Sequence, residues 1–467
     1  MQDIFDYITA HQAQALTDLR TFCAQPSVST EGRGMAEMAA LTRARLAASG
    51  FAVTELPVAG GFPVLYAESQ DRLAPDAPTL LIYNHYDVQP EGDPALWQSP
   101  PFAPTIAGGK VVARGVADTK GNIVARLAAI DAVRAVRGGL PLRVKWIVEG
   151  EEEIGSPHLD AVLAAERERL HADGVLWEFG TYTWEGRPQV TLGLKGMVEV
   201  TLTARGPNRD LHSSMAAYVA SPVWRLVQAL ALLKDENEDI RIPGFYDRVR
   251  SPSDTEIAMV RALPDDDAAL LQSIGLTQFA AGLAGFQRHM AEVFAPTCNI
   301  EGIGGGYTGP GTKTILPGFA QATLDLRLVP DQNPADIFTR LSAFLRDGGF
   351  SDVEVTEEPG SLYPARTPAD HPFVRAAVAA VAEAAGQEPV VWPSSPASGP
   401  MYSFTSGLGL PVVAMGVGNP ASAAHAPNEN IRLADFEAGQ RQIACLLVRL
   451  GATPAAALHT GNPRGGP

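Results

Sequence analysis

Apolar and polar positions alternate with two different periods along the first part of the chain. Stretches in which apolar residues recur every three or four positions predict helices, and short apolar runs bounded by Gly, Pro or polar clusters predict strands. The predicted helices are 3–24, 35–49, 122–137 and 157–170, and the predicted strands are 51–56, 64–68, 79–83, 110–114, 142–148 and 174–177. Strands and helices that follow one another in this way are typical of an α/β domain.

The pattern changes near Gly196, where residues 197–204 alternate apolar and polar side chains. Such alternation is expected of an antiparallel strand with one buried face. The stretch that follows predicts helices at 221–234 and 334–347, a helix-rich segment that ends near 295, and strands at 297–301, 320–328 and 352–356. From Pro368 onward the α/β pattern returns, with helices at 373–385 and 433–450 and strands at 390–392 and 410–416.

These changes predict one α/β domain that is interrupted by an inserted α+β domain. We expect residues 1–196 to form the first part of the α/β domain, residues 197–362 the insertion, and residues 363–467 the second part. A chain of 467 residues has room for more than one domain, and 46% hydrophobic residues can supply a sizeable core.

Composition argues against several partners and settings. The formal net charge of −16 disfavours nucleic acid and anionic membranes as partners. The three cysteines form no CxxC motif, which argues against a disulfide framework and a thiolate zinc site. We find neither a signal-peptide pattern nor an uncharged apolar run of about 18 residues. We therefore expect a cytoplasmic protein that binds neither nucleic acid nor membranes.

His85 and Asp87 stand two positions apart at the end of an apolar run. Side chains at this spacing in a strand point to the same side, so the imidazole and the carboxylate should face one space. One interpretation is a metal ligand with the carboxylate that orients it. The alternative is a buried structural pair, because a metal site also needs ligands from elsewhere in the chain.

Further candidate ligands follow other predicted strands. They are Asp118, one of the pair Glu152 and Glu153, Glu178 and His425. The carboxyl ends of neighbouring strands lie side by side in an open α/β sheet, so these residues could converge there. One carboxylate could then bridge two divalent ions about 3.5–4 Å apart.

The adjacent residues Glu152 and Glu153 leave their strand in different directions. One carboxylate could therefore bind metal while its neighbour acts as the general base for a water molecule. The alternative is a solvated acidic turn, which is the usual meaning of a charge run. The preceding apolar strand and the other motifs favour the metal site.

Four spaced motifs carry a resemblance to a known superfamily. They read HYDVQP at 85–90, RGVADTKG at 114–121, EGEEEIGS at 149–156 and AHAPNE at 424–429. Together they resemble the dinuclear-zinc metallopeptidase and deacylase superfamily, which includes carnosinase-like dipeptidases, glutamate carboxypeptidase and acetylornithine deacetylase. The HYDVQP motif and the GGYTG motif at 305–309 are most similar to the dipeptidase branch. The resemblance implies a zinc-peptidase-like mixed-sheet catalytic domain with an inserted α+β lid and dimerisation domain.

The resemblance also implies a binding site for two divalent metal ions. Zn2+ is the expected metal, with Mn2+ and Co2+ as alternatives. Asp118 would bridge both ions. His85 and Glu178 would complete the coordination of one ion, and Glu153 and His425 that of the other.

Two further roles in catalysis are implied by the resemblance. Asp87 would orient its neighbouring imidazole ligand, and Glu152 would be the general base. The peptide bond between Asp118 and Thr119 is expected to be cis.

The inserted domain would carry the substrate contacts and the dimer interface. By resemblance, His212 reaches the active site of the partner subunit in a homodimer and stabilises the oxyanion. Arg327 would hold the terminal carboxylate of the substrate, for which a guanidinium fork is well suited. Thr314 and Asn299 would make further substrate contacts.

We therefore predict a metallopeptidase that uses water activated by two metals to cleave dipeptides or C-terminal residues. An N-acyl-amino-acid deacylase, similar to the acetylornithine or succinyl-diaminopimelate enzymes, is an alternative within the superfamily. Glu178 stands where dipeptidases typically have Asp, and the loop 397–402 differs from the usual substrate loop, so a small peptide and an N-acyl amino acid both remain candidate substrates. A non-catalytic binding protein with the same fold is the third alternative.

Overall fold

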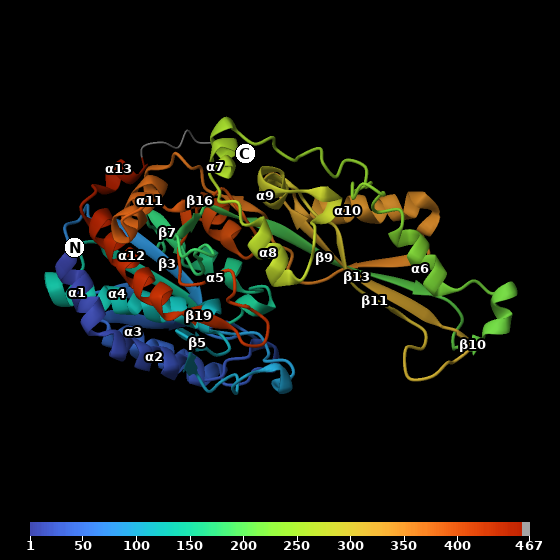
Figure 1. Cartoon of the computed structure of the whole chain (residues 1–467), viewed down its shortest axis with the longest axis horizontal. Helices are drawn as coiled ribbons and strands as arrows, with labels where there is room; N and C mark the ends of the chain where they lie inside the picture. Colours follow the sequence, from blue (N-terminus) through green and yellow to red (C-terminus); the bar gives the residue numbers. More distant parts are fainter. Residues whose placement is uncertain (460–467) are drawn as a thin grey trace.

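The computed structural model describes residues 1–459, which form an elongated molecule (Figure 1). A large α/β body carries both ends of the described chain, and a smaller sheet with its own helices extends from it. Residues 460–467, which close the expected segment 363–467, lie outside the described residues. No helix within residues 1–459 combines the length and the apolar character that crossing a membrane requires.

The body is built on an eight-stranded mixed sheet with the order β1-β2-β6-β3-β7-β18-β8-β16. The strands are β1 Phe51–Leu56, β2 Val64–Ser69, β6 Arg143–Glu149, β3 Thr79–His85, β7 Gly174–Trp177, β18 Val412–Ala414, β8 Gln189–Thr191 and β16 Val390–Trp392. In its centre β6, β3, β7 and β18 run parallel, whereas β1 and β2 are antiparallel to their neighbours. The carboxyl ends of the four central strands therefore lie at one edge.

Helices cover both faces of this sheet. Alternate residues of β3 belong to different cores: Leu80 and Ile82 lie on one face, Leu81 and Tyr83 on the other. The first face is covered by α1 Gln2–Ala10, α2 Gln12–Ala24, α3 Met35–Ala48, α4 Gly121–Arg137, α11 Pro372–Ala385 and α12 Leu433–Gly451. The second face carries α5 Leu159–Ala165, and the short helix α13 Ala455–His459 packs against α11.

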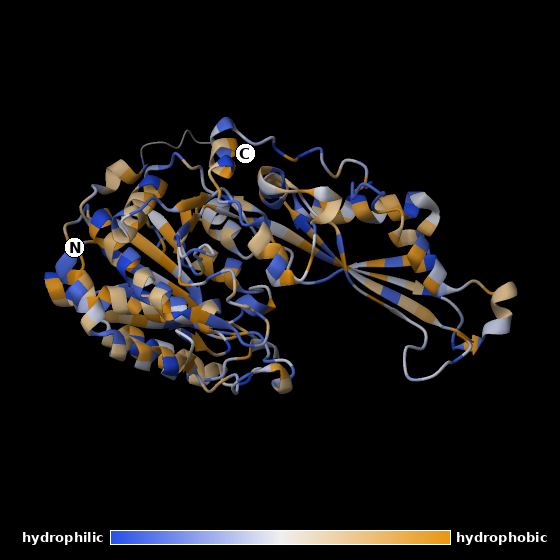
Figure 2. Cartoon of the chain, in the orientation of Figure 1, coloured by the Kyte–Doolittle hydropathy of each residue, from blue (hydrophilic) through white to orange (hydrophobic). Residues whose placement is uncertain are grey.

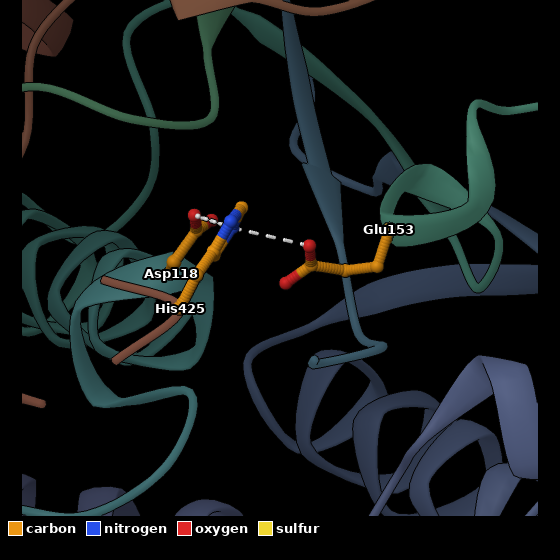
Figure 3. Close-up of side chains that lie close together, drawn as sticks. All are labelled: Asp118, Glu153 and His425. Atoms are coloured by element: carbon orange, nitrogen blue, oxygen red, sulfur yellow. Dashed lines mark hydrogen bonds and ion pairs between the residues drawn. The ribbon is translucent and has the colours of Figure 1, made fainter. Parts of the chain in front are cut away.

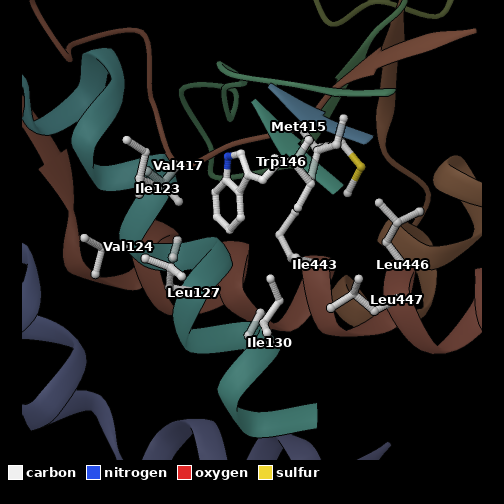
Figure 4. Close-up of a cluster of buried hydrophobic side chains, with 14 of the residues drawn as sticks. Ile123, Val124, Leu127, Ile130, Trp146, Met415, Val417, Ile443, Leu446 and Leu447 are labelled. Carbon is white, nitrogen blue, oxygen red and sulfur yellow. The ribbon is translucent and has the colours of Figure 1, made fainter. Parts of the chain in front are cut away.

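Buried side chains of α4 and α12 pack against the first face of the sheet and hold both helices there. Ile130 of α4, Leu446 of α12 and Trp146 of β6 belong to one cluster of buried side chains, and all three are fully buried (Figure 4). The central strands are mostly hydrophobic, and the helices mix hydrophobic and hydrophilic positions (Figure 2). Strands that are buried on both faces require such apolar sequences, and they form a rigid platform for the residues at their ends.

A second sheet forms the extension. The long strand β9 Gly193–Arg205 starts in the body, where it pairs with β15 Ala365–Arg366 and β17 Ser395–Ser398. From Gly196 to Arg205 it pairs with β13 Phe319–Leu328, its distal part also pairs with β14 Val353–Glu357, and β13 pairs with β11 Asn299–Gly305. The helices α6 Pro222–Leu230 and α10 Pro334–Leu345 complete a separate core with α+β character.

Three helices between α6 and β11 lead back to the body. They are α7 Asp254–Arg261, α8 Asp267–Ile274 and α9 Gly285–Phe294. Glu256 of α7 lies 2.8 Å from the Arg366 guanidinium, and Lys195 donates a hydrogen bond of 2.7 Å to the Ala295 carbonyl. These contacts link the helical segment to β15 and to the start of β9 in the body.

Several helices and strands begin or end at other residues than the sequence predicted. The helix predicted at 3–24 is two helices, α1 and α2, which meet at His11, where the imidazole lies 2.8 Å from the Tyr7 carbonyl. β3 continues to His85, two residues beyond the predicted strand end.

The short strands β4 Thr105–Ala107, β8, β10 Leu211–His212, β12 Ile315–Leu316 and β19 Asn430–Arg432 were not predicted. They are too short for a periodic signal and depend on their partners. The strand predicted at 110–114 is shorter in the structure, where β5 spans Lys110–Val112 and pairs with both β4 and β19.

Candidate metal centre

The site lies where the four central parallel strands end. His85 is the last residue of β3, and Glu178 follows β7 directly. β6 ends at Glu149, and the single turn Glu152–Ile154 follows it. Because these strands are neighbours in the sheet, side chains that are far apart in sequence meet at one edge.

Asp118 is the centre of the arrangement. Its Oδ1 lies 3.1 Å from Nε2 of His85, and its Oδ2 lies 3.2 Å from Nε2 of His425. Glu178 Oε2 lies 3.5 Å from the same His85 nitrogen, and Glu153 Oε2 lies 3.2 Å from the His425 nitrogen. Figure 3 shows the His425 ring between the two carboxylates. One carboxylate thus faces two separate imidazole–carboxylate pairs.

These residues have the chemistry of a site for divalent cations. One ligand atom from each of Asp118, Glu153 and His425 lies within 4.8 Å of the others. Glu178 Oε2 is buried and accepts no hydrogen bond within the described part of the chain. A buried carboxylate oxygen without a donor is costly, and a cation removes that cost. Imidazole nitrogens and carboxylate oxygens suit Zn2+ and similar ions.

Asp87 supports ligands on both sides of the site. Nδ1 of His85, the ring nitrogen that points away from Asp118, lies 3.1 Å from the Asp87 backbone carbonyl and 3.2 Å from Asp87 Oδ1, and Asp87 Oδ2 accepts a hydrogen bond of 3.0 Å from the Glu153 backbone N–H. Asp87 and His85 are fully buried. A carboxylate behind a ligating imidazole fixes its tautomer and raises its basicity. The Asp118–Thr119 peptide bond is cis, as the resemblance implied.

Burial and crowding shift the pKa values of the cluster. Burial raises the pKa of Glu178 to about 8. Burial also raises the pKa of Glu152, and the negative charge of the nearby Glu178 carboxylate raises it further. Hydrogen bonds to Asp118 and Glu153 raise the pKa of His425 to about 10. Burial opposes ionisation of Asp118, but hydrogen bonds with His425 and His85 hold its pKa below the usual range. A divalent cation would offset the mutual repulsion of these carboxylates.

The metal centre opens into a cleft of about 540 Å3. Glu152 lines it together with Asp118, Glu178 and His425. Gly399 lies beside Glu152, and a Cβ atom added there would be 3.5 Å from the nearest Glu152 carboxylate oxygen, an ordinary contact distance. Glu152 is therefore placed where a water molecule and a substrate could both reach it.

The cleft also contains residues that the sequence did not single out. Its far walls include Trp184, Leu270, Arg288 and Trp392. Leu270 and Arg288 come from the helical segment between α6 and β11, and no motif marks any of the four. Only the packing of that segment against the body brings them to the site.

The predicted substrate contacts divide into two groups. Arg327 donates a hydrogen bond of 2.8 Å to the Ser398 hydroxyl, and Ser398 lines the cleft. His212, Thr314 and Asn299 are not among the cleft residues of the described chain. His212 lies on β10 at the distal end of the extension (Figure 1). Within one chain the structure therefore does not bring these three to the metal centre.

A buried arginine below the site was also missed. Arg126 donates hydrogen bonds to the Tyr83 carbonyl (3.0 Å), the Asn84 side chain (2.6 Å) and the Met415 carbonyl (3.2 Å), and it also bonds the Trp177 carbonyl. It thus joins the chain at the ends of β3, β7 and β18, directly before His85 and Glu178. In the sequence it stands in an ordinary amphipathic helix, so no signal marks it.

A mixed α/β sheet with imidazoles and carboxylates gathered at its carboxyl edge has the arrangement of a metal-dependent hydrolase. The chain belongs to the peptidase family M20/M25/M40, whose model matches residues 81–449. This confirms the superfamily that the motifs indicated and the expected fold class.

Relatives in sequence and structure carry dipeptidase and carboxypeptidase names. The chain is 28% identical to the Beta-Ala-His dipeptidase of Mus musculus over 363 residues, which cover 74% of this chain and 73% of the relative. It is 30% identical to the Cys-Gly metallodipeptidase dug1 of Schizosaccharomyces pombe over 263 residues, 55% of each chain. These similarities confirm the dipeptidase branch.

Solved structures share the whole architecture. An M20 family metallo-carboxypeptidase from Sulfolobus solfataricus matches with a TM-score of 0.89 and 36% identity, covering 94% of this chain and 99% of that one. Human carnosine dipeptidase 1 matches with a TM-score of 0.84 and 26% identity, covering 97% and 99%.

Proposed function

We propose that this metallopeptidase is a dipeptidase that hydrolyses the amide bond next to a free terminal carboxylate with the help of two divalent ions. The observation that carries the proposal is the position of Asp118, whose two oxygens face two imidazole–carboxylate pairs beside the cleft. The dipeptidase names of relatives in sequence support the substrate class.

In the proposed site Asp118 would contribute one oxygen toward each of two ions. His85 and Glu178 would hold one ion, and Glu153 and His425 would hold the other. Zn2+ is the proposed metal, and Mn2+ or Co2+ would suit the same nitrogen and oxygen ligands. When bound, the ions polarise the scissile carbonyl and make a water molecule more acidic.

The protein groups carry out the remaining steps. Glu152 accepts the proton of the attacking water and passes it to the leaving amine, which a carboxylate beside the cleft is placed to do. Asp87 holds His85 in one tautomer, so that Nε2 stays directed at Asp118. The walls of the cleft exclude bulk water from the reacting groups.

A substrate panel tests the proposal directly. The purified protein is incubated with dipeptides and with N-acetyl amino acids in the presence of Zn2+, Mn2+ or Co2+. We expect turnover of dipeptides and little or none of N-acetyl amino acids. Deacylation without peptide cleavage would favour the N-acyl-amino-acid deacylase, and the absence of any turnover with bound metal would favour a binding protein.

In the proposed enzyme Arg327 binds the terminal carboxylate of the substrate. Its Nε donates to Asp325 Oδ2 at 2.9 Å, which fixes the guanidinium near Ser398. Because lysine cannot form the planar fork, we expect Arg327→Lys to lower kcat/KM for a dipeptide by about 10–100-fold, the equivalent of a lost hydrogen bond to a charged group. The loss should appear mainly in KM.

Two comparisons control the Arg327 prediction. Arg205 lies in the same sheet, and its side chain is 71% exposed. The control variant Arg205→Lys should leave kcat and KM unchanged. A dipeptide amide lacks the carboxylate, so Arg327→Lys should affect its hydrolysis little. An equal loss with the acid and the amide would contradict the proposed role.

We further propose a homodimer in which His212 serves the partner's site. The support is the exposure of apolar side chains on and beside α6, where Trp224 is 68% and Tyr218 is 74% exposed, and the position of His212 far from its own metal centre. Trp224→Glu should give a monomer in sedimentation experiments, because it places charge on the apolar face. That monomer should retain metal but lose turnover by about 10²-fold or more, as expected from loss of an oxyanion donor.

Complementation separates this role from a loss of stability. His212→Ala and Glu152→Gln should each be inactive alone, and a mixed dimer should regain turnover because one site then has both groups. Ile106→Glu, on the exposed strand β4, is the matched control and should stay dimeric. Full activity in a strict monomer would contradict the proposal.

In the proposed enzyme residues 1–196 and 363–459 of the described chain form the catalytic domain, and residues 197–362 form the lid. The separate core of β9, β13, α6 and α10 supports this division. Two unfolding transitions in calorimetry would agree with it, and a single one would oppose it. A cytoplasmic location is proposed from the reduced, buried cysteines, and cell fractionation tests it.

A further inference from the structure

Glu429 is a buried residue whose carboxylate binds the backbone of the turn that carries Asp118, on the side away from the cleft. It follows the loop of His425 and directly precedes β19, and the residue is 1% exposed. It is absent from the residues that line the cleft within the described chain, so no substrate would touch it. The proposed ligand set gives it no role.

Four donors converge on this carboxylate. Oε2 accepts hydrogen bonds of 2.8 Å from Arg114 Nη1 and from the Gly115 backbone N–H. Oε1 accepts 2.8 Å from the Ala117 N–H and 3.0 Å from the Asp118 N–H. Each oxygen therefore has two donors, and the last of them belongs to the residue that faces both imidazoles.

The backbone joins the same two segments. The Ala113 N–H donates to the Glu429 carbonyl at 3.0 Å, and Asn430 of β19 pairs with Val112 of β5. Arg114, which bonds the carboxylate, also donates to the Pro90 carbonyl at 3.1 Å. The turn of Asp118 and the loop of His425 are thus connected through one side chain.

We infer that Glu429 is a positioning residue that fixes Asp118 relative to His425 and thereby sets the affinity of the site for divalent ions. The inference rests on the proposed two-metal function. The carboxylate holds the turn at the N–H of Asp118, so the Asp118 oxygens stay directed at both imidazoles.

The geometry requires a carboxylate and not an amide. A glutamine has the same shape, but its amide nitrogen is a donor and would face two N–H donors without an acceptor. Glu429→Gln therefore loses two of the four hydrogen bonds and places like dipoles together. Glu429→Asp keeps the charge but withdraws the oxygens by one methylene group, so it should retain only part of the contacts.

The test measures metal binding without any substrate. Zn2+ is titrated into the apo-protein in competition with a chromophoric chelator, and the absorption spectrum of the Co2+-loaded protein reports ligand geometry. We expect about 10–100-fold weaker Zn2+ binding for Glu429→Gln, the usual cost of losing a group that supports metal ligands, and an altered Co2+ spectrum. Glu429→Asp should be intermediate in affinity.

Asp173→Asn is the matched control. Asp173 is a buried carboxylate that accepts a hydrogen bond of 2.7 Å from Thr79 N–H at the start of β3, the end of that strand away from His85. Its change to Asn should lower the thermal midpoint of the apo-protein and leave Zn2+ affinity unchanged.

The outcomes separate this inference from the proposed function. If the wild-type protein binds no Zn2+, the two-metal function fails. If the wild-type protein binds Zn2+ and a folded Glu429→Gln matches it in affinity and Co2+ spectrum, the positioning role is wrong. If Glu429→Gln does not fold, Glu429→Asp decides: wild-type affinity overturns the inference, and weaker binding at an unchanged thermal midpoint supports it.

Discussion

Glu152→Gln should lower kcat for dipeptide hydrolysis by about 10³-fold, within the range that a general base contributes. Glutamine keeps the shape of the side chain, but its amide cannot accept the proton of the attacking water. Glu152 lines the cleft, and within residues 1–459 it forms no ion pair with an imidazole, whereas Glu153 lies 3.2 Å from His425 Nε2. We therefore expect the metal content and KM to remain near the wild-type values.

Two measurements make the Glu152 prediction specific. Metal analysis of the purified variant distinguishes a lost base from a lost ligand. Glu168→Gln is a control for the same chemical change at an exposed position, and it should leave kcat unchanged. Turnover by Glu152→Gln at a rate near that of the wild type would exclude Glu152 as the base.

Asp118→Asn should deprive the protein of both metal ions. The two carboxylate oxygens of Asp118 face different imidazoles, so an amide at this position leaves one half of the site with a donor in place of a ligand atom. The loss of affinity should exceed the roughly 10–100-fold that a supporting residue costs. Activity should fall by about 10³-fold or more, because the ions supply several kcal/mol of transition-state stabilisation.

The effect of Asp118→Asn should differ from that of the other ligands. His425→Ala removes a ligand of one pair only, so we expect it to weaken one ion more than the other in a metal titration. Asp160→Asn, at an exposed position on α5, should bind metal as the wild type does. Normal binding of two ions by Asp118→Asn would contradict a bridging role and would require another residue between the pairs.

Much of the candidate metal centre could be predicted because the residues proposed as ligands stand in local motifs. His85 and Asp87 share a strand end, and the two-residue spacing already placed both side chains in one space. Glu153 and Glu178 each follow an apolar run that the pattern marked as a strand. In an open α/β sheet such ends meet at one edge, so the convergence of distant ligands followed from a general rule.

Other residues gave no comparable signal. Arg126 resembles any basic residue of an amphipathic helix, yet it joins the ends of three strands beneath the ligands. Trp184 and Trp392 reach the cleft from separate loops and strands. Their positions depend on packing between segments far apart in the sequence, and such packing produces no periodic pattern of apolar residues.

The sequence by itself determined the alternation of helices and strands, the inserted α+β segment, the family and the candidate ligands. These features are local, because they depend on side-chain periodicity and on short motifs at strand ends. The tertiary structure alone decided that the two oxygens of Asp118 face two imidazoles, that Glu429 clamps the turn of Asp118, and that His212 lies far from its own metal centre. Those features are set by the order of strands in the sheet and by contacts between segments hundreds of residues apart, and such contacts form only when the chain folds.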